Sequence, residues 1–242
     1  MVNEKINKRI VALWKKHFGT SDKVYAPIFY DDFEPGGLLF IGVNPSFNPK
    51  GSRRAVRGTE FENLDPESFY RWSNIVSDPK YIDMCIAIGR HVHEKYGTYF
   101  KRMHDIAKTV GMPFQHIDIF LYKQTSQKDF LSLVYEKKGE LNEFGRDQLE
   151  IFHEILASMR PVAIVVANAF ASRIIRKHLK HDLMFDDTKG FHGLRLGGKL
   201  VPIFFSSMLS GQRALDTGSY ERLVWHVRQA VSTVNIKSQC KE

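Results

Sequence analysis

The stretch that decides the fold reads Leu38-Leu39-Phe40-Ile41-Gly42-Val43-Asn44-Pro45-Ser46. It follows a Pro-Gly-Gly turn and begins with a short, continuous apolar run. A run of this length that ends abruptly is typical of a strand buried on both faces of a parallel sheet. The polar residues that follow favour a turn directly after the strand.

Strand and helix patterns alternate along the rest of the chain. Further strands are expected over residues 114–122, 161–167 and 197–205, and helices over residues 4–18, 81–107 (broken near Gly97), 147–158, 169–179 and 219–231. Residues 48–80 are polar and aromatic, which favours a long loop with short helices. The alternation predicts an α/β fold, a three-layer sandwich with a central, mostly parallel four-stranded sheet. No linker or repeat divides the sequence, so we expect a single domain over residues 1–242, with a frayed tail at 235–242.

Composition narrows the class of protein. The chain has 242 residues, 43% of them hydrophobic and 26% charged, which excludes a disordered or fibrous chain. No apolar run approaches the roughly 18 residues of a membrane helix, and no apolar signal segment begins the sequence, so a cytoplasmic protein is expected, associated with the nucleoid in a bacterium. Lys and Arg outnumber Asp and Glu by 35 to 27, a net charge of +8. That balance favours a partner that carries phosphates.

Several common kinds of site are excluded by their missing motifs. The sequence contains no phosphate-binding P-loop, and no glycine-rich dinucleotide motif follows the first strand. Ser206 and Ser207 do not lie in the GxSxG motif of a hydrolase. The two cysteines cannot form a four-cysteine metal site, and His91 and His93 point in different directions on an expected helix. We therefore expect neither a metal nor a cofactor.

Ligands of parallel α/β sheets bind at the carboxyl ends of the strands. The segments to inspect are therefore residues 44–48, 118–126, 168–171 and 205–213. At the first of them, Gly42 lets the backbone approach a ligand closely, and Asn44 offers both an acceptor and a donor. The alternative is that Asn44 only stabilises the turn before Pro45.

The segment Gly42-Val43-Asn44-Pro45-Ser46 resembles the first motif of the uracil-DNA glycosylase superfamily, especially its mismatch-specific and single-strand-selective branches. Residues 117–130 are similar to the second active-site strand of the mismatch branch and its polar exit. Residues 163–171 are similar to a hydrophobic strand that leads into a helix of small residues. Residues 205–210 fall where the superfamily has its second motif. The order and spacing fit over residues 36–230.

This resemblance implies a parallel four-stranded sheet flanked by helices and a monomeric DNA glycosylase of base-excision repair. Such an enzyme flips uracil or a related damaged or mismatched base out of single- or double-stranded DNA and hydrolyses the bond between base and sugar. Asn44 matches the residue that orients the attacking water. Because an Asn is not a strong base, it would hold the water in place rather than remove its proton. Val43 and Ser46 would offer backbone groups to the base pocket. Phe61 matches an aromatic residue that stacks on the base, Phe47 competes for that role, and core packing is the alternative for either.

Two positions depart from the superfamily pattern. Asp118 stands where many relatives have the Asn that contacts the base edge. An ionised Asp only accepts hydrogen bonds, which favours a base that presents donors, and the alternative is that Asp118 caps a turn. Phe205 stands where relatives have a His or Asn that stabilises the leaving base, so Ser206, Ser207 or the nearby His192 would have to supply that hydrogen bond.

DNA contacts are expected from two loops. Lys50, Arg53, Arg54 and Arg57 directly follow the first motif and are expected to contact phosphates, unless they are merely a solvated basic segment. After the second motif, Ser210, Gln212 and Arg213, with Leu215, lie where relatives insert a wedge into the DNA stack. A solvated loop is the alternative there.

Two other functions stay open at this point. Because the second motif is altered, the chain can be a weakly active or non-catalytic member of the superfamily that binds DNA or nucleobases. An unrelated α/β hydrolase of nucleosides or nucleotides is the third candidate, against which the lack of an acidic metal-binding cluster counts.

Overall fold

The computed structural model describes residues 3–95, 97–136, 139–211 and 214–239. The chain divides into two compact units. Unit 1 comprises Met1–Phe33, Asn44–Gly97 and Ile119–Ile155, and unit 2 comprises Glu34–Val43, Thr98–Asp118 and Leu156–Glu242. The chain leaves unit 2 directly after its first strand and again directly after its second.

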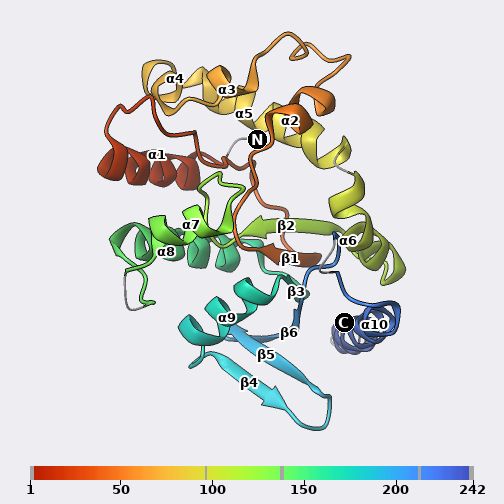
Figure 1. Cartoon of the computed structure of the whole chain (residues 1–242). Helices are drawn as coiled ribbons and strands as arrows, with labels where there is room; N and C mark the ends of the chain where they lie inside the picture. The colour runs from red at the N-terminus through yellow and green to blue at the C-terminus, as the bar shows by residue number, and fades with distance from the viewer. Residues whose placement is uncertain (1–2, 96, 137–138, 212–213, 240–242) are drawn as a thin grey trace. The chain divides into compact units, whose positions relative to one another are not determined.

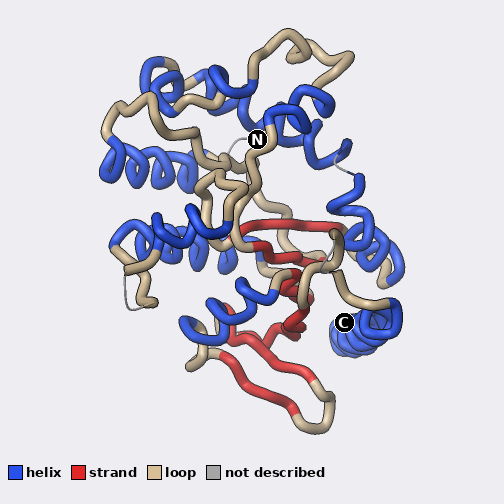
Figure 2. Tube along the Cα trace, in the orientation of Figure 1, coloured by secondary structure: helices blue, strands red, loops and turns tan. Residues whose placement is uncertain are grey.

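Unit 2 contains a six-stranded sheet, drawn in red in Figure 2. Its strands are β1 (Leu38–Gly42), β2 (Phe114–Asp118), β3 (Ala163–Ala167), β4 (Leu183–Asp186), β5 (Phe191–Leu196) and β6 (Lys199–Ser206). The order across the sheet is β2-β1-β3-β6-β5-β4. Neighbours from β2 to β6 are parallel, whereas β5 pairs antiparallel with both β6 and β4.

The α/β class is confirmed, and the prediction of four strands is wrong. All residues of β1 and β3 are buried, which explains why both appear in the sequence as continuous apolar runs. The strands that the sequence did not predict are β4 and β5, which extend the parallel part of the sheet as an antiparallel hairpin. The sheet is therefore mixed, and with helices on its faces it is compatible with a three-layer fold.

The helices of unit 2 cover the sheet on two sides. They are α6 (Gly97–Thr109), α9 (Ala169–His178) and α10 (Thr217–Gln239). Figure 1 shows α9 on one face and α6 and α10 on the other. The Arg102 guanidinium of α6 lies 5.0 Å from the ring centre of Tyr220 on α10, and the Tyr220 hydroxyl donates to the Arg102 carbonyl at 3.2 Å. Helix α10 includes residues 235–239 of the tail expected to be frayed, and residues 240–242 lie outside the described residues.

Unit 1 is helical. Its helices are α1 (Glu4–Phe18), α2 (Pro49–Ala55), α3 (Pro66–Phe69), α4 (Trp72–Ser77), α5 (Lys80–Lys95), α7 (Gln127–Val134) and α8 (Glu143–Met159), the last of which continues into unit 2 after Ile155. The short helices α2 to α4 confirm the expectation for residues 48–80. The expected helix over residues 81–107 is two helices, α5 and α6, on either side of residue 96.

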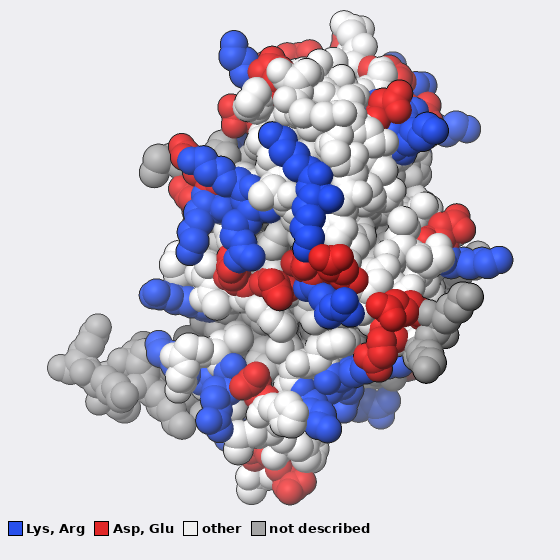
Figure 3. Space-filling model, turned by 90° about the vertical axis from the view of Figure 1, so that its left-hand side faces the viewer, with Lys and Arg blue, Asp and Glu red and all other residues white. Residues whose placement is uncertain are grey.

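An aromatic cluster and ion pairs hold α1 against α8. The fully buried Trp14 packs edge-on against Phe144, with a ring-centre distance of 5.4 Å. Beside it, Lys16 pairs with Glu143 and Asp147, each at 2.7 Å, and His17 lies 2.8 Å from Asp147. Figure 3 shows this side of the molecule, where Lys and Arg lie next to Asp and Glu. Because opposite charges are paired there, that surface is a poor candidate for binding phosphates.

In the part of the chain that the structure describes, none of the helices combines the length and the apolar character needed to cross a membrane.

Candidate functional site

The side chain of Asn44 is fixed by three backbone carbonyls. Asn44 begins the segment Asn44–Gly97 of unit 1. Its Nδ2 donates to the carbonyl of Gln124 at 2.7 Å, of Pro45 at 3.2 Å and of Tyr122 at 3.3 Å. Since a carbonyl can only accept, these partners establish which end of the amide is the nitrogen. The Oδ1 atom accepts no hydrogen bond from any residue that the structure describes, and it is left as a fixed acceptor. Two of the three partners are distant in sequence, so a local turn does not account for this geometry.

The loop around Asn44 is joined to the segment after Tyr122. The Gln124 amide donates to the Pro45 carbonyl at 3.0 Å. The Thr125 hydroxyl donates to the Phe47 carbonyl at 2.7 Å and accepts from the Phe47 amide at 3.2 Å. It also lies 3.0 Å from the hydroxyl of Ser46, which is exposed. These bonds hold the backbone of the first motif in one conformation, so Asn44 is positioned before any ligand arrives.

The two aromatic candidates for base stacking have different surroundings. The ring of Phe47 is partly exposed and packs 4.3 Å from the ring of Tyr25 and 5.8 Å, edge-on, from that of Tyr70. Phe61 is only 7% exposed and lies 6.1 Å from the ring of His91. Of the two, Phe47 has more surface available to a ligand.

In unit 2, Gly42 and Asp118 are paired residues at the carboxyl ends of β1 and β2. The Asp118 carboxylate lies over the α-carbon of Gly42. A Cβ at position 42 would lie 2.1 Å from Asp118 Oδ1 and 3.4 Å from His116 Nε2. Only glycine leaves room for the carboxylate at this point. Val43, which follows, is 9% exposed.

The Asp118 carboxyl group is buried without a polar partner. Asp118 is 6% exposed, and no described residue forms a hydrogen bond or ion pair with its carboxyl group. Burial raises the pKa of this group to about 7, because a charged carboxylate is poorly solvated there. Burial, with the Asp118 charge as a second cause, also raises the pKa of the Tyr99 hydroxyl. The turn-capping alternative for Asp118 has no hydrogen bond to support it.

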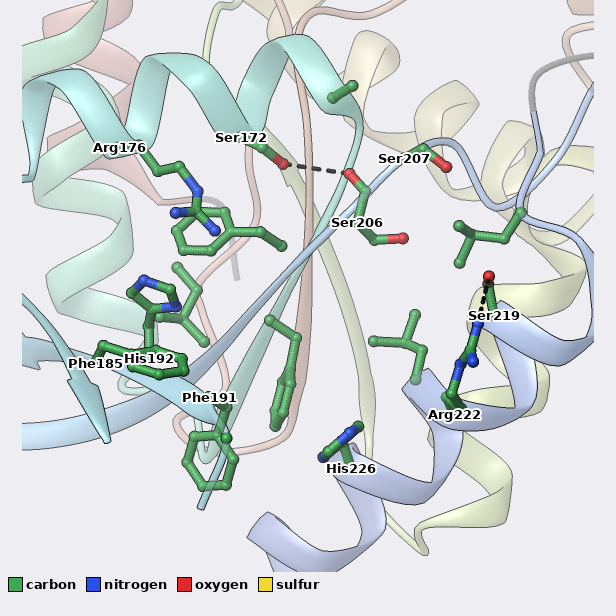
Figure 4. Close-up of a pocket in the computed structure, with 17 residues that line it drawn as sticks. Ser172, Arg176, Phe185, Phe191, His192, Ser206, Ser207, Ser219, Arg222 and His226 are labelled. Atoms are coloured by element: carbon green, nitrogen blue, oxygen red, sulfur yellow. Dashed lines mark hydrogen bonds between the residues drawn. The ribbon is translucent and has the colours of Figure 1, made fainter. Parts of the chain in front are cut away.

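The second motif ends β6 and lines a pocket of unit 2. Ser206 and Ser207 lie on the wall of this pocket, which has a volume of about 640 Å³. The Ser206 hydroxyl oxygen is buried and has no hydrogen-bond partner among the described residues, and Figure 4 shows it directed toward the pocket. The Ser206 carbonyl accepts from the hydroxyl of Ser172 at 3.2 Å. Ser206 is thus placed to bind a ligand of this pocket.

Phe205 lies under a guanidinium group. The Arg176 guanidinium of α9 is 4.1 Å from the centre of the Phe205 ring, a cation–π contact. His192 of β5 meets the same ring edge-on at 5.3 Å. Burial first, and the charge of Arg176 second, lower the pKa of His192. The ring of Phe205 therefore serves as a platform for a cation.

The structure describes most, but not all, of the residues expected to contact DNA. Lys50, Arg53, Arg54 and Arg57 are all exposed in or just after α2, and Arg53 forms an ion pair with Asp65. Ser210 is partly exposed in the loop after β6. Gln212 and Arg213 lie outside the described residues.

Sequence reasoning missed Arg176 and Arg222, which line the pocket of the second motif. Arg176 follows Ser172 by four residues on α9 and so shares its face, but the sequence does not indicate that this face borders β6. Arg222 lies on α10, within the helix expected over residues 219–231, and nothing in the sequence of that helix marks it as lining a pocket. In the described residues, no group of three or more His, Cys, Asp or Glu side chains is placed to hold a metal ion.

No model of a protein family, no curated protein and no solved structure matches the chain.

Proposed function

We propose that this protein is a DNA glycosylase that hydrolyses the bond between a damaged or mismatched base, uracil or a related one, and its sugar. The observation that carries the proposal is the fixed amide of Asn44. Its nitrogen is occupied by three carbonyls, so its oxygen is held ready to accept a hydrogen bond from a water molecule. Fixing the water reduces the entropy lost on reaching the transition state, without requiring a strong base.

Asp118 is the proposed reader of the base. It is paired with Gly42 at the carboxyl ends of β2 and β1. With a pKa of about 7, its carboxyl group is largely protonated in mildly acidic solution. A protonated carboxyl both donates and accepts, as the Asn of the superfamily does, and suits the adjacent donor and acceptor of uracil. The ionised form only accepts and suits a base that presents donors.

Two further features support the proposal. The four parallel strands β2-β1-β3-β6 are consistent with the uracil-DNA glycosylase fold that the sequence resembles. The exposed cations of the α2 segment, of which Arg53 is paired with Asp65, supply charge for phosphate contacts.

One observation favours a weakly active or purely DNA-binding protein instead. Phe205 cannot donate a hydrogen bond to a leaving base, and its ring is covered by Arg176. Loss of one such donor costs about 100-fold to 1,000-fold in rate. Slow turnover is therefore expected.

The test uses labelled oligonucleotides that contain uracil, hypoxanthine, xanthine or a thymine mismatch, each single- and double-stranded. After incubation with the full chain, alkali cleaves any abasic site. We expect cleavage with at least one substrate and a loss of about 100-fold or more in Asn44→Ala. The matched control is Asn63→Ala, which changes an exposed Asn of the same unit and should retain full activity.

Two results would contradict the proposal. Equal activity of Asn44→Ala and the original chain would exclude the role of Asn44. Absence of cleavage on every substrate, with DNA binding still measurable, would replace the glycosylase by a DNA-binding protein.

A further inference from the structure

The pocket beside the second motif lies at an unpaired edge of β6. Ile203 is the last residue of β6 that pairs with β5, opposite His192. Beyond it, residues 204–206 pair only with β3 in the described sheet. Helices α9 and α10 flank this edge, so the pocket is open to side chains from both. All of its lining residues belong to unit 2.

The charge of the pocket is positive. Arg176 from α9 and Arg222 from α10 reach it from opposite sides (Figure 4), and no Asp or Glu is among the described residues that line it. Arg176 has no acidic partner in the described residues, and its cation faces the ring of Phe205. Arg222 donates to the Ser219 hydroxyl at 3.2 Å, which orients its guanidinium. Two guanidinium groups at one pocket favour a ligand with an anionic group such as phosphate.

Aromatic rings form much of the remaining wall. His192 lies 4.9 Å from the ring of Phe185 on one side of the strand edge. On the other side, Phe191 lies 5.1 Å from the ring of Phe204, and both line the pocket. Phe185 is 55% exposed, so its ring is available to a partner. Rings of this kind stack on planar bases of any sequence.

Hydroxyl groups complete the pocket. The unpartnered Ser206 hydroxyl is directed into it, and Ser207 lies beside Ser206. A buried hydroxyl without a partner is costly unless a ligand or water satisfies it. The pocket volume of about 640 Å³ lies in the range typical of small-molecule sites.

We propose that this pocket binds a nucleotide, with the base against the aromatic wall and the phosphate attracted by the positive charge of Arg176 and Arg222. This is a second binding site, formed by residues other than Asn44 and Asp118, and it goes beyond the proposed glycosylase function. The same chemistry is offered by a free mononucleotide and by one nucleotide of a single DNA strand.

The test is isothermal titration calorimetry of the full chain with three probes: thymidine 5′-monophosphate, thymidine and inorganic phosphate. We expect the monophosphate to bind more tightly than either of the other two. Arg176→Ala and Arg222→Ala should each weaken its binding by about tenfold or more. The matched control is Arg173→Ala, which removes an exposed arginine of α9 that contacts Phe170 and does not line the pocket.

The source of the nucleotide is resolved by competition against a labelled thymidine pentanucleotide. Displacement by the monophosphate assigns the pocket to a DNA strand, and simultaneous binding assigns it to a free nucleotide. The proposal is overturned if the monophosphate does not bind, if inorganic phosphate binds as tightly, or if the control and the two pocket variants bind equally. Arg176→Lys keeps the positive charge, so it guards against a loss caused only by misfolding. Asn44→Ala should still bind the monophosphate, because Asn44 does not line the pocket. This keeps the test independent of the glycosylase proposal.

Discussion

Replacing Asp118 by Asn should make unit 2 more stable than in the original chain, and this difference should grow as the pH rises. The carboxyl group has a pKa of about 7 in the folded protein and about 3.8 when exposed. At about 1.36 kcal/mol per pH unit, this difference corresponds to about 4 kcal/mol. Because the folded pKa is the higher one, the folded state binds more protons, and stability falls as the pH rises from about 4 to about 7. Above pH 7 the full destabilisation by the buried charge is present.

The Asn side chain has nearly the same shape and carries no charge at any of these pH values. The stability difference between Asp118→Asn and the original chain should therefore be smallest near pH 4 and reach about 4 kcal/mol in favour of the variant near pH 8. Hydrogen exchange of the amides of β1 and β2, compared at equal pH, reports this difference for the sheet itself. Carbon-13 NMR of labelled Asp residues gives the pKa directly, with Asp118→Asn identifying the resonance.

The control is Asp187→Asn, which changes an exposed carboxylate in the turn between β4 and β5. Because this side chain is exposed, the change should not reproduce the gain of about 4 kcal/mol expected for Asp118→Asn near pH 8. A resonance of Asp118 that titrates near pH 4, or a stability difference for Asp118→Asn that stays constant from pH 4 to 8, would refute the reasoning. The first result would mean that the carboxylate is solvated, and the proposed protonated reader of the base would be lost with it.

Two further changes test the geometry around the strand ends. Gly42→Ala places a Cβ 2.1 Å from Asp118 Oδ1 and should destabilise the sheet by about 1–3 kcal/mol in urea unfolding. Gly42→Ala combined with Asp118→Ala should recover most of that loss. Equal losses in the single and double variants would exclude the clash. Asn168→Ala removes the acceptor of the Phe170 and Ala171 amides at the start of α9 and should lower the free energy of unfolding by about 1 kcal/mol in the same measurement. Asn168→Asp keeps an acceptor and should lower it much less. Similar losses in both variants would show that the cap is not the cause.

Burial on both faces explains why β1 and β3 could be predicted from the sequence. β1 and β3 are buried at all five positions, so their sequences are continuous apolar runs. β4 and β5 are largely half-buried or exposed, and charged residues such as Asp186 and Arg195 interrupt them. Their pairing depends on each other and on β6 rather than on a strong local pattern.

The end of β2 shows a different limit. The apolar run continues to Leu121, and the sequence therefore predicts a strand to residue 122. The strand ends at Asp118, which pairs with Gly42, the last residue of β1. Beyond it, the Leu121 amide donates to the Oε1 of Gln148 at 2.8 Å. Gln148 is fully buried on α8, and a partner at this distance in sequence cannot be inferred from either segment alone.

The candidate site divides in the same way. A strand end with Gly42 and Asn44 is a local pattern, and the sequence correctly places Gly42 at the end of a buried strand and Asn44 after it. The carbonyls that fix Asn44 belong to Tyr122 and Gln124, which no local pattern connects with it. The cation above Phe205 comes from Arg176 on a separate helix. Sequence therefore identifies the candidate residue more readily than the contacts that orient it.

The position of Phe205 bears on how the two proposed sites relate. If the chain were a glycosylase with a simply degraded second motif, Phe205 would need no particular neighbour. Instead its ring supports Arg176, and the next residue, Ser206, directs its hydroxyl into the same pocket. We therefore propose that Phe205 and Ser206 serve a different binding surface, whose lining includes neither Asn44 nor Asp118. Excision and nucleotide binding should then be lost separately, the first in Asn44→Ala and the second in Arg176→Ala. Joint loss of both in either variant would mean that the second motif still serves the excision site.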